Sequence, residues 1–435
     1  ENLLNEWTRI VTPETVRKLQ RTLYRKAKAE PRYRFYSLYG DLCRKDVLET
    51  ALRQVTANGG CAGVDGVAIA TVNAEQVRAE WLAELEKELR EKRYKPQAVR
   101  RAYIRKDDGK MRPLGIPTVK DRVVQAAAVI VLMPIFEADM HEHSYAYRPG
   151  KNAHQAIARI VTAIRSGRTE IIDADLSGYF DSIPHHRLMK LVAKRVSDGT
   201  MLKLIRAWLR APIEERNPKG GPPQRRRNEK GTPQGGVISP LLANVYLDRL
   251  DKEVNAERTC RPVMVRYADD FVIHCPVGRA QGLKARLKRW LEARGLKLNE
   301  EKTRVVDVRN EGFKFLGFQV SWRKHSYRSG HYVHVEPHAK SQQKLREEIQ
   351  KQFNHRTEGA DEVQALKKLN RQLKGWSGYF RYGNPSHVFG KMQFYVHGKV
   401  ARWLWRRHGK KWDPRWKNLT ASYGLYDLSR CRAKG

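Results

Sequence analysis

The sequence predicts an α+β protein whose last hundred residues form an all-helical module. From about residue 120 to residue 335, segments with strand-like spacing of apolar residues alternate with segments of helical spacing, and beyond them only helical spacing continues. The chain has 435 residues, enough for two or three domains that each bury a core. Hydrophobic residues make up 40% of the chain, so it is not a disordered basic tail.

Before residue 120, helices are expected to precede a β-hairpin. Apolar residues recur at helical spacing in residues 47 to 55 and in residues 77 to 89, and a glycine-rich break at residues 58 to 66 separates these two helices. Residues 99 to 104 and residues 112 to 116 flank a turn. These two segments are therefore predicted to pair as an antiparallel hairpin.

A helix of mostly apolar residues is predicted over residues 120 to 136. Its most apolar stretch, residues 123 to 136, is too short to span a bilayer, and the chain has no apolar run of 18 residues, so no membrane partner is expected. Residues 216 to 230 are rich in Gly, Pro and Arg, which predicts an exposed, mobile connection. Apolar stripes predict three helices in the tail, over residues 345 to 353, 363 to 373 and 389 to 403.

The charge of the chain predicts a polyanionic partner. Lysine and arginine together number 85 against 47 aspartates and glutamates, which gives a net charge of +38. Nucleic acid is the first candidate, because each neutralised phosphate releases condensed counterions; a merely solubilising surface is the alternative. Five of the ten tryptophans lie in the last hundred residues, where flat rings beside basic side chains suit stacking on unpaired bases. Burial in the core is the alternative for each ring.

Cysteine usage and the first residues predict a cytoplasmic location. The five cysteines include no CxxC motif, so neither a disulfide framework nor a zinc site is indicated. Residues 1 to 10 lack the apolar region of a secretory signal. We therefore expect a reducing compartment.

Two segments place carboxylates at the end of a β-rich run. The first, residues 171 to 181, contains Asp175, and the second, residues 263 to 275, contains Asp269 and Asp270 between two apolar half-strands. Adjacent aspartates are disfavoured inside a strand, so the pair is expected at the tip of a hairpin, where a plain turn is the alternative to a functional site. If Asp175 meets this tip, the three carboxylates need either raised pKa values or divalent cations. Two Mg²⁺ ions in such a site would serve in-line phosphoryl transfer.

The motif Tyr267-Ala268-Asp269-Asp270 resembles the YADD box of reverse transcriptases. The surrounding sequence is similar to one family in particular, the bacterial group II intron-encoded reverse transcriptase/maturases without an HNH endonuclease domain. The resemblance runs from about residue 40 to residue 430. Seven further blocks follow the family's order, at residues 101–118, 144–154, 173–183, 231–244, 298–303, 315–318 and 373–380.

The resemblance implies a right-hand polymerase fold, with fingers and a ferredoxin-like palm, followed by an all-helical thumb and maturase domain. The domain boundaries that it implies are a basic N-terminal helical extension (1–45), fingers with part of the palm (46–170), a palm with the catalytic aspartates (171–335), a helical thumb (336–376) and an RNA-binding maturase domain (377–435). No HNH-type cluster of Cys and His is present, so DNA endonuclease activity is not expected from this chain.

The resemblance also assigns the catalytic residues. Asp175, Asp269 and Asp270 are expected to hold two Mg²⁺ ions, and the carbonyl of Leu176 is a further candidate ligand. Two neighbouring aspartates, Asp173 and Asp181, rank below these three: Asp173 shares the strand face of Asp175 but lies one alternation away, and Asp181 falls where the strand should be ending.

Five residues are expected to contact the incoming dNTP. By resemblance, Lys106 and Arg112 hold the triphosphate, the arginine as a planar fork and the lysine as a point charge. Phe180 would clash with a ribose 2′-hydroxyl, with simple core packing as its alternative. Gln234 would touch the nucleotide from a loop rich in glycine. Lys302 is expected beside the departing pyrophosphate, with a solvated surface lysine as the alternative.

The implied function is an RNA-directed DNA polymerase that uses two-metal-ion nucleotidyl transfer and, as a maturase, assists splicing and retrotransposition. The implied partners are group II intron RNA, an RNA template, a DNA primer or target DNA, and dNTP, in a ribonucleoprotein of the bacterial cytoplasm. A basic and aromatic surface near the C-terminus is expected to bind RNA, namely Arg402, Trp403, Arg406, Arg407, Lys410 and Lys411 together with Trp405. The alternatives are a reverse transcriptase in a non-intron role such as host defence, and an RNA-binding splicing cofactor without polymerase activity.

Overall fold

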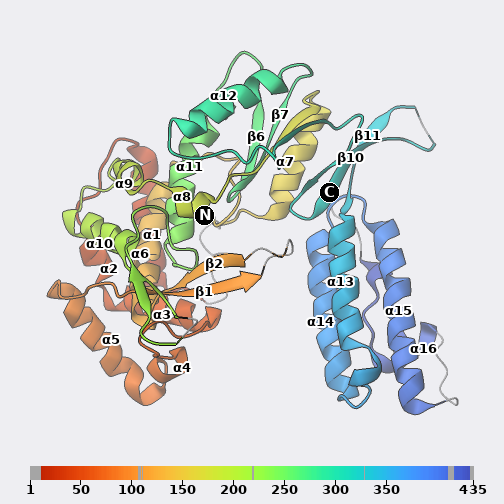
Figure 1. Ribbon diagram of the computed structural model, residues 1–435, viewed down its shortest axis with the longest axis horizontal. Helices are drawn as coiled ribbons and strands as arrows, with labels where there is room; N and C mark the ends of the chain where they lie inside the picture. Colours follow the sequence, from red (N-terminus) through yellow and green to blue (C-terminus); the bar gives the residue numbers. More distant parts are fainter. Residues whose placement is uncertain are drawn as a thin grey trace. The chain divides into compact units, whose positions relative to one another are not determined.

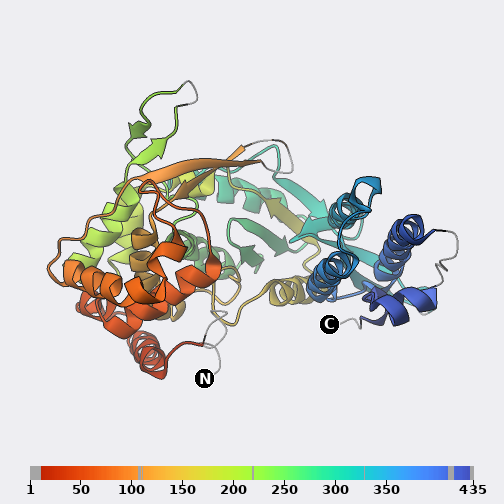
Figure 2. The ribbon, with the colours of Figure 1, turned by 90° about the horizontal axis from the view of Figure 1, so that it is seen from below.

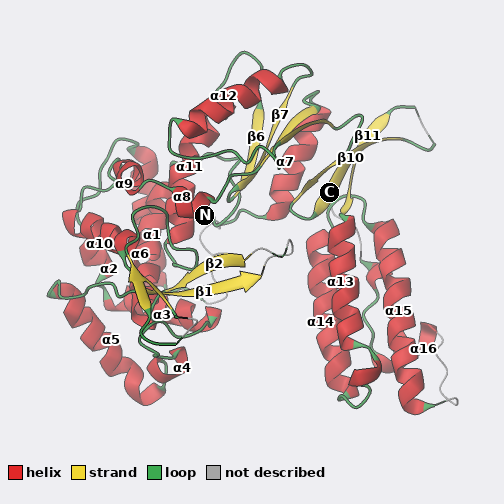
Figure 3. Ribbon diagram, in the orientation of Figure 1, coloured by secondary structure: helices red, strands yellow, loops and turns green. Residues whose placement is uncertain are grey.

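The computed structural model describes residues 11–105, 109, 111–217, 220–327, 329–409 and 416–431 (Figures 1 and 3). Its backbone divides into two compact units, each assembled from three stretches of the chain. The first unit comprises Glu1–Asn152, Ala174–Ile273 and Gln281–Arg304, and the second comprises Ala153–Asp173, His274–Ala280 and Val305–Gly435. The five-domain division expected above remains a prediction, since compactness alone separates the chain at other positions.

The core of the first unit is built around α6 (Val119–Glu137), the apolar helix predicted over residues 120 to 136. Almost all of its side chains are buried, and the Thr118 side chain begins the helix by accepting a hydrogen bond from the Asp121 backbone N–H at 3.0 Å. Helices α1 and α3 pack against it. The other helices of this N-terminal part are α1 (Glu14–Ala29), α2 (Leu38–Leu42), α3 (Lys45–Asn58), α4 (Ile69–Val72) and α5 (Glu75–Arg90).

The predicted hairpin is confirmed by strands β1 (Val99–Arg105) and β2 (Met111–Ile116), which pair antiparallel with Arg105 opposite Met111. They belong to a sheet of order β2-β1-β4-β5, in which β4 (Ile213–Glu215) runs parallel to β1. Residues 216 to 230, expected to be an exposed connection, contain the short strand β5 (Gln224–Arg226), which pairs antiparallel with β4. All three residues of β5 are exposed, and the hairpin projects from the rest of the unit in Figure 2.

A second sheet has the strand order β6-β7-β3-β8. Its strands are β3 (Glu170–Ala174), β6 (Val263–Tyr267), β7 (Asp270–Cys275) and β8 (Arg304–Asp307). Between β3 and the end of β8 the chain also forms α8 (Tyr179–Ser182), α9 (His185–Val192), α10 (Gly199–Arg210), α11 (Ser239–Asn255) and α12 (Ala280–Glu292). Helix α11 packs against both α9 and β6.

The second unit combines a small sheet with the helices predicted for the tail. Its sheet has the order β11-β10-β9, from β9 (Phe313–Phe315), β10 (Phe318–Lys324) and β11 (His331–Pro337). The helices are α7 (Ala153–Arg165), α13 (Ala339–Gln352), α14 (Glu362–Phe380), α15 (Ser386–His408) and α16 (Trp416–Tyr423), with short 3-10 turns η2 (His355–Thr357) and η3 (Leu428–Arg430). The three predicted tail helices are thus confirmed by α13, α14 and α15. Among the described residues, no helix combines the length and apolar character needed to cross a membrane.

His274, on β7, is a completely buried histidine in the second unit. Its ring packs edge-on against Phe313, with the ring centroids 6.0 Å apart. Burial, together with the charges of Arg159 and Arg168, lowers the pKa of His274 from its ordinary 6.5 to about 3. In the unfolded chain His274 therefore becomes protonated near pH 6.5, whereas in the folded chain it stays neutral down to about pH 3.

We expect acid to destabilise the protein partly through this histidine. The contribution of His274 to the free energy of unfolding is fully present above the pKa of this histidine in the unfolded chain, 6.5. As the pH falls through that value, the free energy of unfolding decreases, by about 2 kcal/mol between pH 7.5 and pH 5. The variant His274→Phe should remove that part of the pH dependence in urea unfolding followed by circular dichroism. The exposed His387, replaced by Phe, is the control. An unchanged pH dependence in His274→Phe would contradict the prediction.

Candidate active site

Asp269 and Asp270 lie at the turn between β6 and β7, as the sequence predicts. β6 ends at Tyr267 and β7 begins at Asp270, so Ala268 and Asp269 form a two-residue hairpin loop. Ala268 has a left-handed backbone, with a φ of 61°. This conformation is strained for alanine, and surrounding contacts have to hold it in place.

A buried ion pair beneath the turn supplies those contacts. Arg266 is 0% exposed, and its guanidinium binds the carboxylate of Asp251 on α11, with Nε 2.8 Å from Oδ1 and Nη2 2.6 Å from Oδ2. Its Nη1 donates to Asn244 Oδ1 at 2.8 Å and to the Ala268 carbonyl at 2.9 Å. Because this last bond reaches the strained residue itself, the ion pair fixes the direction of the backbone that carries the two aspartates.

Asp175 directly follows β3 and is held by a segment more than 120 residues away in the sequence. Asn299 donates to it twice, from Nδ2 to Oδ2 at 3.0 Å and from its backbone N–H to the Asp175 carbonyl at 2.8 Å. Lys302 Nζ lies 3.5 Å from the same Oδ2. The next residue, Leu176, forms an antiparallel β-bridge with Leu298. Lys302, the expected pyrophosphate contact, therefore lies against the first of the predicted catalytic carboxylates.

The strand order brings Asp175 and Asp270 to one edge of the sheet. β3 and β7 are neighbours, and Cys275 Sγ at the end of β7 donates to the Glu170 carbonyl at the start of β3, at 3.5 Å. The two strands therefore run antiparallel. The end of β3, which Asp175 follows, consequently lies at the same edge as the start of β7.

Asp175, Asp269, Asp270 and the Leu176 carbonyl offer only oxygen ligands. Magnesium prefers such hard donors, so the residue types fit the ion. Within the described residues, no three His, Cys, Asp or Glu side chains are arranged so that they could hold a metal ion. The shared metal site of the three carboxylates thus stays a prediction. Of the lower-ranked aspartates, Asp173 lies within β3 and is partly buried.

Gln234 lies in a loop that is fixed to both the hairpin and the segment after β3. Its carbonyl accepts a hydrogen bond from the Gly115 N–H on β2 at 2.6 Å, and its Nε2 donates to Asp181 Oδ2 at 3.2 Å. Gly235 has a φ of 116°, and a Cβ there would approach the Gly115 carbonyl to 2.5 Å, so only glycine allows this contact. Asp181, which ranked below the expected catalytic residues, therefore accepts a hydrogen bond from Gln234, the residue expected to contact the nucleotide.

The other expected dNTP contacts surround this loop. Phe180 is partly buried and packs edge-on against Tyr179, with centroids 5.4 Å apart, while its carbonyl accepts from the Thr232 N–H at 2.7 Å. Arg112 lies on β2 and is exposed. Lys106 lies outside the described residues.

Tyr147 is a residue near the turn that the sequence reasoning missed. Its φ is 55°, also left-handed, and its side chain is 52% exposed. Partial burial, followed by the nearby charge of Asp269, raises the pKa of its hydroxyl, while Arg112 lowers it. Arg148, buried against Glu137 with Nη2 2.7 Å from Oε1, anchors the segment. The block at residues 144–154 was recognised in the sequence, but a strained tyrosine backbone leaves no sequence pattern.

The expected RNA-binding surface needs one correction. Trp403 is only 1% exposed and packs edge-on against Phe353, with centroids 5.3 Å apart, so it belongs to the core of the helices and cannot stack on RNA. The reason is helical spacing: Trp403 is part of the apolar stripe that buries α15. Arg407 is exposed, but its Nη1 donates to the carbonyls of Glu358 and Ala360 at 2.7 and 2.6 Å.

The remaining members of that surface are exposed or not described. Arg402 is exposed, and Arg406 Nη1 lies 3.4 Å from the Glu358 carboxylate. Lys410 and Lys411 lie outside the described residues. Two rings on α15 are exposed instead of Trp403. They are Trp405, 45% exposed, and Phe394, which is 81% exposed and was not singled out from the sequence.

Comparison with known proteins identifies two domains. The family model "Reverse transcriptase (RNA-dependent DNA polymerase)" matches residues 104–320, and the model "Group II intron, maturase-specific domain" matches residues 342–424. Protein YkfC of Escherichia coli K12 is 32% identical in an alignment of length 368, and the match covers 75% of this chain and 93% of YkfC. Group II intron-encoded protein LtrA of Lactococcus lactis subsp. cremoris is 29% identical in an alignment of length 354, and the match covers 67% of this chain and 57% of LtrA. An uncharacterized 91 kDa protein in the cob intron of Schizosaccharomyces pombe is 31% identical over 224 residues, 51% of this chain and 26% of that protein.

We expect Arg266→Met to lower the free energy of unfolding by about 3–5 kcal/mol, because Asp251 would remain as an unpaired buried charge. The double variant Arg266→Met with Asp251→Leu removes both charges and should recover most of the loss. Urea unfolding of the parent, both single variants and the double variant measures this. If the double variant loses as much free energy of unfolding as the two single variants lose together, the two charges do not stabilise the fold as a pair.

Proposed function

The chain belongs to the group II intron-encoded reverse transcriptase/maturase family, and we propose that it copies RNA into DNA at the turn between β6 and β7 and binds a structured intron RNA. Its enzyme class is RNA-directed DNA polymerase. The observation that carries the proposal is the hairpin loop with Asp269 and Asp270 at the sheet edge that Asp175 also occupies.

Each residue at this edge of the sheet has its own role in the proposed reaction. Asp175, Asp269 and Asp270, with the Leu176 carbonyl, would hold two Mg²⁺ ions. When bound, these ions would activate the primer 3′-hydroxyl and stabilise the leaving pyrophosphate. Lys302 lies 3.5 Å from Asp175, so its ammonium group is placed to neutralise negative charge that develops beside that carboxylate.

The nucleotide-binding residues would orient the dNTP. Arg112 and Lys106 would bind the triphosphate from the β1–β2 hairpin. Gln234 would contact the nucleotide from the loop that Gly115 and Asp181 hold, and Phe180 would exclude a ribose 2′-hydroxyl by its bulk. The support for these roles is that Gln234, Phe180 and Arg112 sit on elements hydrogen-bonded to one another.

The RNA-binding part of the proposal rests on α15. Phe394, Arg402 and Trp405 are exposed and are spaced by eight and three residues, which places them on one face of the helix. An exposed ring beside a guanidinium suits stacking on unpaired RNA bases. The proposed partners are an intron RNA, an RNA template, a DNA primer or target DNA, and dNTP, in a ribonucleoprotein of the bacterial cytoplasm.

Replacing both turn aspartates should abolish polymerisation. The variant Asp269→Ala with Asp270→Ala removes two of the proposed metal ligands, and we expect dNTP incorporation on a primed RNA template to fall by roughly a thousandfold or more. RNA affinity should stay within about twofold, because neither aspartate lies on α15. The exposed acids Glu80 and Glu84 of α5, both replaced by Ala, change the net charge equally and serve as the control. Undiminished synthesis in the Asp269/Asp270 variant would refute the site.

Loss of the exposed rings of α15 should weaken intron binding. Phe394→Ala and Trp405→Ala should each lower the affinity for a group II intron RNA by roughly 5- to 100-fold, the range expected for one lost base–aromatic stack. Filter binding at fixed salt concentration measures it. Val363→Ala, which truncates an exposed apolar residue of α14, is the matched control. Equal affinities for all three variants and the parent protein would show that this face does not bind RNA.

A further inference from the structure

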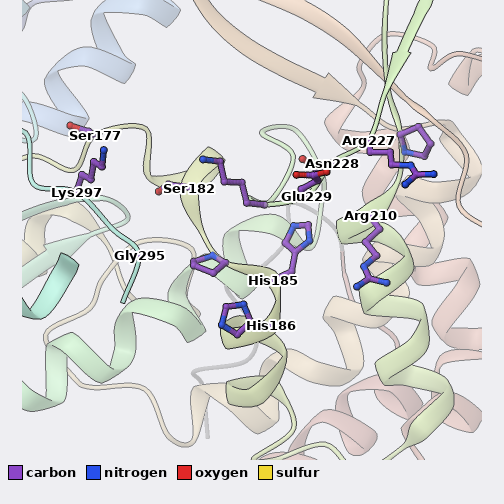
Figure 4. A pocket seen from close by; sticks show the side chains of 13 residues that line it. Ser177, Ser182, His185, His186, Arg210, Arg227, Asn228, Glu229, Gly295 and Lys297 are labelled. Carbon is purple, nitrogen blue, oxygen red and sulfur yellow. The ribbon is translucent and has the colours of Figure 1, made fainter. Parts of the chain in front are cut away.

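The first unit contains a groove that none of the assigned roles uses. Its volume is about 960 Å³, and it lies among the start of α9, the end of α10, residues 227 to 230 and residues 295 to 297 (Figure 4). In Figure 4, Arg210 and Arg227 lie on one side of the view, Ser177 and Lys297 lie on the other, and His185 and His186 stand between them.

The groove is lined by cations that lack a partner. The side chains of Arg210, Arg227, Lys230 and Lys297 make no ion pair or hydrogen bond with any residue in the described part of the chain, and Glu229 is the one acidic residue of the lining. Four positive charges against one negative charge leave this concavity positively charged, and a bound anion would lower the mutual repulsion of the cations.

The groove adjoins the proposed catalytic residues. Ser177 follows Asp175 by two residues, and its N–H donates to the Lys297 carbonyl at 2.9 Å. Lys297 in turn precedes Asn299, which holds Asp175, by two residues. One end of the groove is therefore built from the same paired segments that position the first catalytic carboxylate.

A second groove continues toward the nucleotide-binding loop. It has a volume of about 410 Å³ and shares residues 227 to 230 with the first. Its lining includes Gly115, Asp181 and Pro233, which contact or neighbour Gln234. The rim at residues 227 to 230 thus stands between a basic groove and the expected dNTP contacts.

We propose that the basic groove binds polyphosphate, namely the triphosphate of a nucleoside triphosphate approaching the active site and the pyrophosphate leaving it. This inference rests on the proposed polymerase function. The lining contains no Phe, Tyr or Trp to stack on a base, so the groove recognises phosphate charge rather than base identity. The concavity and its closeness to Asp175 favour a compact polyphosphate over an extended nucleic acid strand.

The test removes three of the four positive charges that line the groove, and none of the three belongs to a proposed catalytic residue. The variant Arg210→Gln, Arg227→Gln, Lys230→Gln should raise the KM for dNTP about tenfold with little change in kcat, and should weaken binding of inorganic tripolyphosphate to the full chain by a similar factor, measured by calorimetry. The matched control replaces Lys190, Lys203 and Arg206 by Gln. These are exposed cations of α9 and α10 outside the groove.

The readouts separate failure of this inference from failure of the proposed function. If the parent chain polymerises but the groove variant keeps both its KM for dNTP and its tripolyphosphate affinity, the groove proposal is wrong. It is also wrong if the groove variant loses only primer–template affinity, which would assign the groove to a nucleic acid strand, or if the control variant loses as much tripolyphosphate affinity. Selective loss of tripolyphosphate binding in the groove variant supports the groove even if the parent chain shows no synthesis. Circular dichroism confirms folding, and the three single variants replace the triple variant if it does not fold.

Discussion

The buried pair of Arg266 and Asp251 is the interaction on which the geometry of the active site depends. It joins β6 to α11, and the same guanidinium binds the carbonyl of the strained Ala268. The Arg266 backbone also pairs with the segment that leads to Tyr147, through a parallel bridge to Ser144. Arg266 thus ties together a helix and a hairpin loop through its side chain and a neighbouring segment through its backbone.

The electrostatics of the chain explain how acidic residues can gather in so basic a protein. The net charge of +38 favours any polyanion, yet Asp175 and the Asp269–Asp270 turn lie at one edge of a sheet. Lys302 and Asn299 contact Asp175, so its charge is balanced by groups of the first unit itself. The basic groove beyond Ser177 places further positive charge close to this acidic edge. Opposite charges on neighbouring surfaces suit a reaction in which polyphosphate and metal ions must both arrive.

Local patterns in the sequence predict individual helices and strands, but they do not predict contacts between segments that are far apart in the chain. The β1–β2 hairpin, α6 and the tail helices follow from apolar spacing, and the two-residue loop at Asp269 follows from adjacent acids between apolar half-strands. No local pattern indicates that Asn299 holds Asp175, because that contact depends on pairing across more than 120 residues. The burial of Trp403, by contrast, could be predicted from the sequence. Its position in the apolar stripe of α15 is a stronger indication of burial than its basic neighbours are of RNA binding.

The sheet β2-β1-β4-β5 joins the β1–β2 hairpin to the β4–β5 hairpin, which borders the groove. β4 lies beside β1 in parallel register, with Val99 opposite Ile213, and the Val99 N–H donates to the Pro212 carbonyl at 2.7 Å. Pro212 and Arg227 both line the groove, on either side of the β4–β5 hairpin. Because β1 pairs with β4 at these residues, a movement of β1 would also move Pro212 and the wall of the groove that Pro212 lines.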